Sequence, residues 1–191
     1  MHRLLLKMVE SEAGKDAVAE VLRRADIAAE SVFRMNENYD DAQWRRLLDV
    51  AFELLEIPNE RAVELFADYF LTDALQRWPT WFAISHNSRD FLKRQIAIHN
   101  GFYTGIRDPE MRRKLRDKFH IEERNGMLVT RYRSPNQLCS LYVALARWVI
   151  QHYGDTASVE HVACTQQGSP DCEIHIQWSA LRAADPARSQ A

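Results

Sequence analysis

The sequence has no segment suited to crossing a membrane as a helix. None of its 191 residues lies in an apolar stretch that approaches the roughly 18 residues such a helix needs. The short apolar run near the N-terminus soon breaks into charges, unlike a secretory signal peptide. We therefore expect a cytoplasmic protein without a membrane partner.

Neither sign of charge is in excess, and familiar catalytic motifs are missing. With 25 Lys and Arg against 27 Asp and Glu, the net charge is -2, which does not favour binding to nucleic acid. The chain has no glycine-rich phosphate loop and no Ser/His/Asp or Cys/His arrangement for nucleophilic catalysis. The pair Asp40-Asp41 is better explained as a helix cap than as catalytic carboxylates. We expect a protein that is not an enzyme.

What is present predicts an α+β fold. Hydrophobic residues make up 46% of the chain, which is enough for a core. Apolar residues recur at helical spacing through the first two-thirds of the chain, and two hairpins separated by a helix follow. The expected strands are 119–124 with 127–132, joined by a type I′ Asn-Gly turn, and 159–164 with 172–178.

One histidine lies in an apolar helical context. A helix predicted from about Ser88 places Phe91, Leu92 and Ile96 on the turns before His99. A neutral imidazole nitrogen at the edge of an apolar pocket suits haem iron. A core histidine with a satisfied hydrogen bond explains the same pattern, so both interpretations stay open at this point.

Polar side chains recur at every second position after the first hairpin. Strand alternation would place Tyr132, Ser134 and Asn136 on one side. Three hydrogen-bonding groups on one side can hold a pair of carboxylates, such as the propionates of haem. An ordinary strand edge is the alternative interpretation.

The three cysteines are an odd number, so they cannot form a closed set of disulfides within one chain. Cys164 and Cys172 bracket the turn of the second hairpin, and His161 and Cys139 lie before it. Three thiolates and one imidazole make a closed tetrahedral set for structural zinc. Buried free cysteines are the alternative, and we favour zinc because the spacing around the turn allows convergence. His175 is expected at an exposed strand position outside this set.

Taken in order along the chain, these motifs resemble the H-NOX (haem-nitric oxide/oxygen binding) family. The resemblance rests on Phe91-Leu92 followed by His99, and on Tyr132-x-Ser134 after the polar stretch. The segments Asn38-Tyr39-Asp40-Asp41, Ile57-Pro58 and 64–70 precede them in the order and spacing of the family.

The resemblance implies one domain over residues 1–178 that encloses haem b. A helical part would occupy 1–60, a haem- and zinc-binding part with a small antiparallel sheet would occupy 61–178, and 179–191 would be a disordered tail. His99 would ligate the iron. The pocket-lining positions would be Leu5, Ala74, Leu141 and Leu145. A subset of bacterial members carries zinc at positions that match Cys139, His161, Cys164 and Cys172.

The same resemblance implies how haem is held. Tyr132 and Ser134 would bind the propionates, and Asn136 stands where the family motif Tyr-x-Ser-x-Arg has arginine. Asn136 can donate a hydrogen bond but carries no charge, unless Arg131 or Arg133 supplies one.

The implied function is a gas sensor that acts on a separate protein. Oxygen-binding members have tyrosine at the position of Leu141, and leucine cannot donate a hydrogen bond to dioxygen, so the implied ligand is nitric oxide. Nitric oxide would weaken the His99–iron bond and shift the helix of His99, which would regulate a histidine kinase or a cyclic-dinucleotide enzyme in trans. The alternative is a zinc-stabilised, redox-responsive interaction module with weak or no haem binding.

Overall fold

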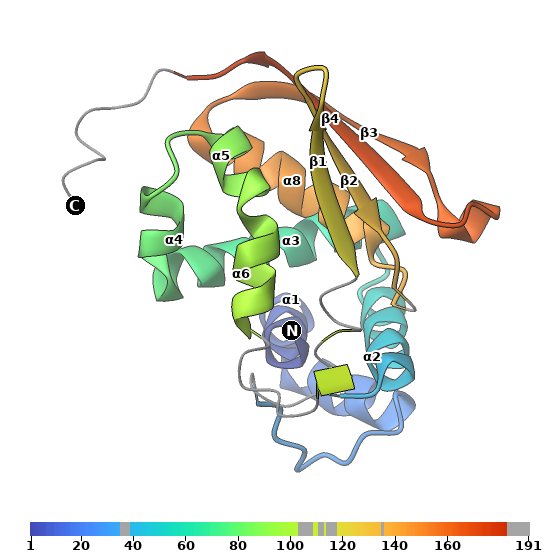
Figure 1. Ribbon diagram of the computed structural model, residues 1–191. Helices are drawn as coiled ribbons and strands as arrows, with labels where there is room; N and C mark the ends of the chain where they lie inside the picture. Colours follow the sequence, from blue (N-terminus) through green and yellow to red (C-terminus); the bar gives the residue numbers. More distant parts are fainter. Residues whose placement is uncertain (35–38, 103–108, 111–112, 114–117, 135, 183–191) are drawn as a thin grey trace. The chain divides into compact units, whose positions relative to one another are not determined.

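A computed structural model of the chain describes residues 1–182 apart from 35–38, 103–108, 111–112, 114–117 and 135; the side chains of His99 and Phe102 are also outside the description (Figure 1). The chain forms two compact units, Met1–Phe70 and Leu71–Ala191, so the division falls inside one helix. Within the ranges just given, every helix is too short or too polar to span a membrane.

The first unit contains helices α1 (His2–Arg24), α2 (Asp41–Leu54) and the start of α3 (Asn59–Arg77). Helix α1 is interrupted at Gly14, where φ is 84° and ψ is 177°. This conformation suits glycine because a Cβ atom would make it costly. The break separates two buried apolar stripes, which accounts for the two helical patterns in the sequence. Their buried members include Leu5, Met8 and Val9 before the break and Val21 and Leu22 after it.

The start of α2 confirms the expected helix cap and selects Asp40 as the residue responsible. The Asp40 Oδ2 atom accepts a hydrogen bond from the backbone N–H of Gln43 at 2.9 Å. Asp41 is the first helical residue, where its negative charge is favourable against the helix dipole.

A buried histidine lies at the centre of an aromatic cluster in this unit. The His2 ring is stacked on Phe33 at 4.5 Å between centroids, and the rings of Tyr39 and Trp44 lie at 4.7 and 4.8 Å. His2 is 8% exposed, and its Nε2 atom has no hydrogen-bond partner among the described residues. Burial lowers the pKa of His2 to about 4, so the ring is neutral near pH 7.

The second unit combines helices with one antiparallel sheet, which confirms the predicted α+β class. Its helices are α4 (Pro79–Ala83), α5 (Ser88–Lys93), α6 (Gln95–Phe102) and α8 (Cys139–Tyr153). The strands β1 (Phe119–Arg124), β2 (Met127–Tyr132), β3 (Thr156–Ala163) and β4 (Cys172–Ala180) are arranged in the order β1-β2-β4-β3. A short 3-10 turn, η1 (Thr165–Gln167), lies between β3 and β4.

The first hairpin matches its prediction, whereas the second differs at its ends. Asn125 and Gly126 have φ angles of 52° and 79°, as a type I′ turn requires. Strand β3 ends at Ala163, so Cys164 lies outside it, and β4 continues past Trp178 to Ala180. The second hairpin is therefore longer at its open end and looser at its turn than the sequence pattern suggested.

The helix predicted from Ser88 to His99 is in fact two helices. Helix α5 ends at Lys93 with Arg94 as its C-cap, and α6 begins at Gln95 and carries His99. The Arg94 Nη1 atom donates to the backbone oxygen of Trp81 at 3.2 Å and to Ser85 Oγ at 2.7 Å. This tertiary anchor at the junction has no counterpart in local sequence periodicity.

One face of the sheet is buried and provides the core of the unit. Leu128, Ile174 and Ile176 on β2 and β4 are fully buried. On the same face the hydroxyl groups of Thr130 and Tyr142 form a buried hydrogen bond of 2.8 Å between β2 and α8. Burial raises the pKa of Tyr142 to about 12, so it stays neutral and hydrogen-bonded at any ordinary pH.

A carboxylate holds the start of α5 against the end of α8. The Asp155 Oδ2 atom accepts from the backbone N–H and the hydroxyl of Ser88, at 2.7 and 2.6 Å. The Trp178 Nε1 atom donates to the same hydroxyl at 2.9 Å, and Arg182 N donates to Asp155 Oδ1 at 2.7 Å. Helix α5 is thus connected to both α8 and β4.

Replacing Asp155 with alanine should therefore destabilise the protein. The buried donors of Ser88 lose their acceptor, and we expect the free energy of unfolding to fall by about 3 kcal/mol. Urea denaturation measures this change, and Asp49→Ala on the exposed side of α2 is the control, with an effect within about 0.5 kcal/mol. Equal effects of the two substitutions would contradict the anchoring role of Asp155.

The burial of His2 predicts a specific loss of stability in acid. Its pKa of about 4 in the folded state lies below the value of 6.5 for an unperturbed histidine. Below pH 6.5 the unfolded chain therefore binds a proton at His2 that the folded protein does not bind until the pH approaches 4. Between pH 7 and pH 4 the wild type should lose about 3 kcal/mol more stability than His2→Phe, which keeps the aromatic stacking. Urea denaturation at both pH values compares them, and parallel losses in the two proteins would show that His2 is not responsible.

Candidate functional site

The predicted Tyr-x-Ser-x-Asn group lies at the end of β2, but it is not a continuous strand face. Tyr132 is the last residue of β2 and is 4% exposed, while Ser134 and Asn136 follow it in a turn and are half-buried. The Ser134 Oγ atom accepts a hydrogen bond from the backbone N–H of Asn136 at 3.3 Å. Turn geometry rather than strand alternation therefore keeps Ser134 and Asn136 close together.

Asn136 leaves a buried polar atom without a partner. Its Oδ1 atom is inaccessible to solvent and makes no hydrogen bond among the described residues. Leaving such a group unpaired costs about 1–3 kcal/mol, so it marks a place where a ligand with polar groups would be stabilising. The two ends of an amide differ only by a half-turn, which lets Asn136 present a donor instead.

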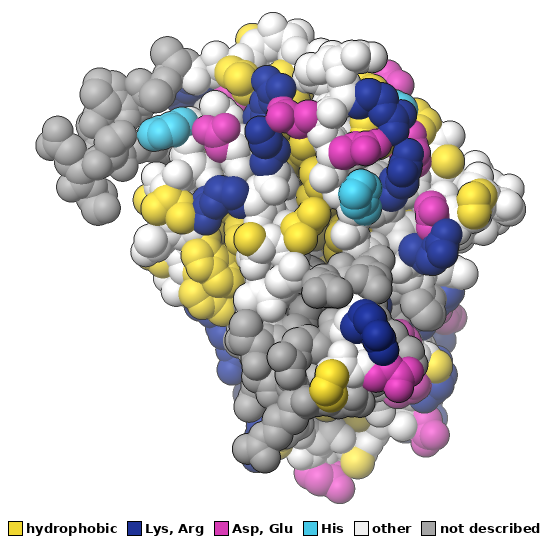
Figure 2. Space-filling model, in the orientation of Figure 1, with side chains coloured by type: hydrophobic (Ala, Val, Ile, Leu, Met, Phe, Trp, Pro, Cys, Tyr) yellow, Lys and Arg dark blue, Asp and Glu magenta, His cyan; other side chains and the backbone are white. Residues whose placement is uncertain are grey.

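The neighbouring arginines do not replace the missing charge at position 136. Arg131 donates from Nε to Glu173 Oε2 at 3.0 Å, and Arg133 donates from Nη2 to Asp171 Oδ2 at 3.0 Å. Both guanidinium groups are therefore neutralised by carboxylates at β4. Figure 2 shows basic and acidic side chains interleaved in this way over the strands. The group at Asn136 consequently offers neutral donors alone.

Three of the four expected pocket positions lie in the second unit. Ala74 is 5% exposed and Leu141 is 4% exposed, while Leu145 is half-buried and lies one turn after Leu141 on α8. Leu5 is fully buried and belongs to the first unit. The apolar character of Ala74, Leu141 and Leu145 suits the wall of a pocket for a flat hydrophobic ligand.

His99 lies in the second half of α6, but its side chain is outside the described part of the structure. One helical turn before it, Gln95 has a buried Oε1 atom with no described hydrogen-bond partner. Sequence reasoning did not single out Gln95, because an amide among apolar residues carries no distinctive pattern. It is a second unpaired polar group close to a predicted ligand of iron.

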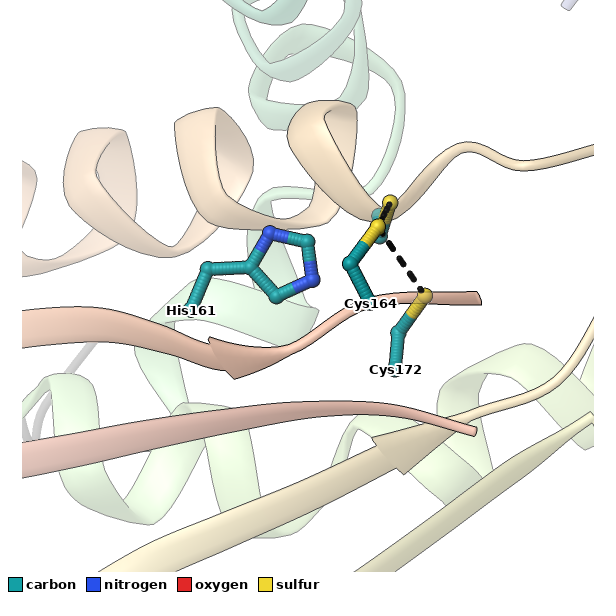
Figure 3. Close-up of side chains that lie close together, drawn as sticks. His161, Cys164 and Cys172 are labelled. Atoms are coloured by element: carbon teal, nitrogen blue, oxygen red, sulfur yellow. Dashed lines mark hydrogen bonds between the residues drawn. The ribbon is translucent and has the colours of Figure 1, made fainter. Parts of the chain in front are cut away.

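The predicted cysteine and histidine residues converge at the turn of the second hairpin. Cys139 is the first residue of α8, and His161 is on β3. Cys164 directly precedes η1, and Cys172 is the first residue of β4. One ligand atom from each residue lies within 4.8 Å of the others, and the three thiols are buried. In Figure 3 the imidazole of His161 points toward Cys164 and Cys172.

The sulfur spacing fits metal binding. The Cys164 Sγ atom lies 3.9 Å from Cys139 Sγ and 4.0 Å from Cys172 Sγ. Tetrahedral zinc with bonds to sulfur of about 2.3 Å requires sulfur atoms about 3.8 Å apart, whereas a disulfide requires about 2 Å. The four residues therefore offer a donor set of the kind that holds a tetrahedral metal ion.

A β-bulge lies between His161 and the next member of this cluster along the chain, Cys164. His161 pairs with Ile174 and Ala163 pairs with Glu173, so one extra residue is inserted between them in β3. Ile174 is fully buried, which places His161 on the core face of the sheet, the face that carries Cys172. Periodicity alone could not reveal this bulge.

The electrostatics of the thiols differ, and Thr165 is the reason. Burial raises the pKa of Cys139 to about 12, and its neighbour Cys172 contributes to the shift. Burial also acts to raise the pKa of Cys172, but hydrogen bonds with Thr165, Cys139 and Cys164 together lower that pKa. The Thr165 backbone N lies 3.3 Å and its hydroxyl 3.4 Å from Cys172 Sγ. Thr165 escaped the sequence analysis, although the residue after Cys164 is a natural source of such a donor.

His175 is separate from this cluster, but its surroundings differ from the expected exposed position. It is half-buried, and its Nε2 atom lies 2.6 Å from Glu173 Oε1. It pairs with Val129 and Glu160 across the sheet and lies an odd number of positions from both Cys172 and Ile174 on β4. Its side chain therefore occupies the face of the sheet opposite to His161.

Comparison with known proteins gives one family and several related folds. The model of the family described as Haem-NO-binding, HNOB, matches residues 1–161. No curated protein matches the chain.

Solved structures of H-NOX proteins resemble the chain over almost its whole length. An H-NOX domain from Shewanella oneidensis in the Fe(II)CO state has a TM-score of 0.74 at 18% identity, covering 93% of this chain and 96% of that one. An unliganded Fe(II) H-NOX protein from K. algicida has a TM-score of 0.70 at 17% identity, covering 93% and 94%. An oxygen-binding H-NOX domain related to soluble guanylate cyclases has a TM-score of 0.69 at 15% identity, covering 93% of each chain. At these identities the similarity establishes the fold.

Proposed function

Because the chain belongs to the haem-NO-binding family of gas-sensor domains, we propose that it is a haem-based nitric oxide sensor that regulates a separate signalling protein. The observation that carries this proposal is the family match over residues 1–161, which includes every residue assigned here to haem. We assign His99 as the iron ligand and Tyr132, Ser134 and Asn136 as the groups that hold the propionates.

The residues at the end of β2 fit this assignment. A propionate accepts hydrogen bonds, and the side-chain amide of Asn136, whose buried Oδ1 atom has no partner among the described residues, can turn to offer a donor. The Ser134 hydroxyl accepts from Asn136 N, so its own proton is available for donation. Ala74, Leu141 and Leu145 supply an apolar lining, which haem requires around its macrocycle.

Leu141 supports nitric oxide as the ligand in preference to oxygen. His99 would hold the iron of bound haem, and that iron would supply the chemistry that takes up a diatomic gas such as nitric oxide. Dioxygen needs a hydrogen-bond donor for stable binding in this family, and the side chain of Leu141 has none.

Helices α5 and α6 are suited to transmit the signal. Helix α5 is anchored through Ser88 to Asp155, and Arg89 and Lys93 both pair with Glu123 of β1, at 2.6 and 2.8 Å. Helix α6 begins after the Arg94 junction, so it can move while α5 stays in place. A change at His99 would then alter the surface offered to a histidine kinase or a cyclic-dinucleotide enzyme in the cytoplasm.

Absorption spectra of the ferrous protein test the proposal. We expect a Soret band in the purified protein, a new spectrum with nitric oxide, and no stable oxygen complex. His99→Gly should lose the band and regain it when free imidazole replaces the missing ligand, whereas His86→Ala, at an exposed position, should leave it unchanged. A colourless protein after haem reconstitution would reject the proposal.

We also propose that Cys139, His161, Cys164 and Cys172 bind zinc. Their sulfur spacing and the donors from Thr165 to Cys172 support a tetrahedral thiolate site. Zinc would replace the protons of the buried thiols and close the turn of the second hairpin.

Metal analysis tests the zinc site with a matched pair of histidines. The purified protein should contain an equimolar amount of zinc, and His161→Ala should reduce zinc affinity by at least about tenfold. His175→Ala, on the opposite face of the same sheet, should retain zinc. Equal zinc affinity in both variants, or no zinc in the wild type, would exclude the proposed site.

A second candidate function is a zinc-stabilised, redox-responsive interaction module with weak or no haem binding. The observation that favours it is that the residues assigned to the propionates carry no charge. Asn136 replaces arginine, and Arg131 and Arg133 are paired with carboxylates. Zinc thiolates are oxidisable, so peroxide would release the metal and change signalling. A zinc-containing but colourless protein would select this function over the haem sensor.

A further inference from the structure

The residues proposed to hold the haem propionates and the residues proposed to bind zinc meet on two neighbouring strands. Tyr132 on β2 and Cys172 on β4 are direct partners in the antiparallel register. Along the chain, Cys139 lies three residues after Asn136. The residues assigned to the propionates are thus bounded by one zinc ligand across the sheet and by another along the chain.

Ion pairs hold the first of these connections in register. Arg131 pairs with Glu173, its direct partner on β4, and Arg133 pairs with Asp171. These two pairs lie immediately on either side of the Tyr132–Cys172 pair, so β2 and β4 cannot slip past each other there without breaking them. A displacement of Cys172 therefore displaces Tyr132.

The second connection passes through a strained residue. Gln137 has a φ angle of 51°, a conformation that is unfavourable for a residue with a side chain. Its backbone N–H donates to the carbonyl of Ser134 at 3.1 Å, and its carbonyl accepts from Gln166 Nε2 in η1 at 3.4 Å. The turn that presents Ser134 and Asn136 is thus held between α8 and the loop that follows Cys164.

Resting on the proposed function, we propose that metal occupancy of the Cys139–His161–Cys164–Cys172 site controls how tightly Tyr132, Ser134 and Asn136 hold haem. A metal ion bonded to Cys139 and Cys172 restrains both connections and pre-organises the three hydrogen-bonding groups. Pre-organisation matters here because these groups carry no charge to compensate for poor geometry. By linkage, bound haem strengthens metal binding by the same factor.

Haem dissociation measures the coupling directly. Haem transfer to excess apomyoglobin should be about tenfold faster after zinc is removed with a chelator, within the usual range of allosteric coupling. Chelator competition should show zinc bound about tenfold more tightly in the haem-loaded protein than in the haem-free protein. The zinc-retaining variant His175→Ala should show the same coupling as the wild type.

A double cycle separates this coupling from general destabilisation. In Asn136→Ala the zinc-dependent ratio of haem dissociation rates should fall to about twofold, because the pre-organised group is incomplete. In Leu5→Ala, which removes a fully buried side chain in the first unit, the ratio should stay near the tenfold value of the wild type. Zinc that acted merely by preventing unfolding would give one ratio in all three proteins.

The outcomes distinguish the inference from the function on which it rests. Equal haem dissociation rates with and without zinc, in a protein that binds both, overturn the coupling and leave the haem sensor intact. An unchanged ratio in Asn136→Ala, or a protein with haem but no zinc, likewise overturns the coupling alone. A protein that cannot be loaded with haem overturns both.

Discussion

The antiparallel pairing of β2 with β4 is the constraint on which the second unit depends. It places Leu128 opposite Ile176 and Thr130 opposite Ile174, so that these four buried residues share one face. The same register brings Tyr132 opposite Cys172. Because side chains alternate with a period of two, a slip of one residue would expose this core and separate the two candidate sites.

Helix α8 connects that face to the rest of the unit. Its first residue is Cys139, its buried side carries Leu141, and its C-terminus ends at Gly154 in a left-handed conformation with φ of 72°. Asp155 then captures the start of α5. A single helix therefore joins the cysteine and histidine cluster, the apolar residues around Leu141 and the anchor of the segment that leads to His99.

The energetics of the hydrogen bonds proposed to hold the propionates explain why Asn136 is compatible with haem binding. A neutral hydrogen bond contributes about 0.5–1.5 kcal/mol and one to a charged partner about 1.5–3 kcal/mol, so exchanging arginine for asparagine costs about 1 kcal/mol. That cost is a factor of about five in affinity. Burying the apolar surface of a macrocycle and bonding its iron to a histidine outweigh it, since each Å² of apolar surface contributes about 25 cal/mol.

Local sequence patterns predicted the elements whose cause is itself local. The Asn125-Gly126 pair predicted the first hairpin with its bounds, because a type I′ turn needs two residues that tolerate positive φ. Asp40 capped the expected helix because its carboxylate reaches an N–H three residues ahead. The spacing of Cys164 and Cys172 around a turn predicted that they would converge.

Tertiary structure alone decided the rest. Arg94 divides the predicted helix because its guanidinium reaches Trp81 and Ser85, and a bulge after His161 interrupts the regular pairing of β3 with β4 before Cys164. Thr165 lowers the pKa of Cys172 only because the turn brings its N–H to that sulfur. These contacts join residues that periodicity treats as independent, and they exist only once the strands and helices have packed.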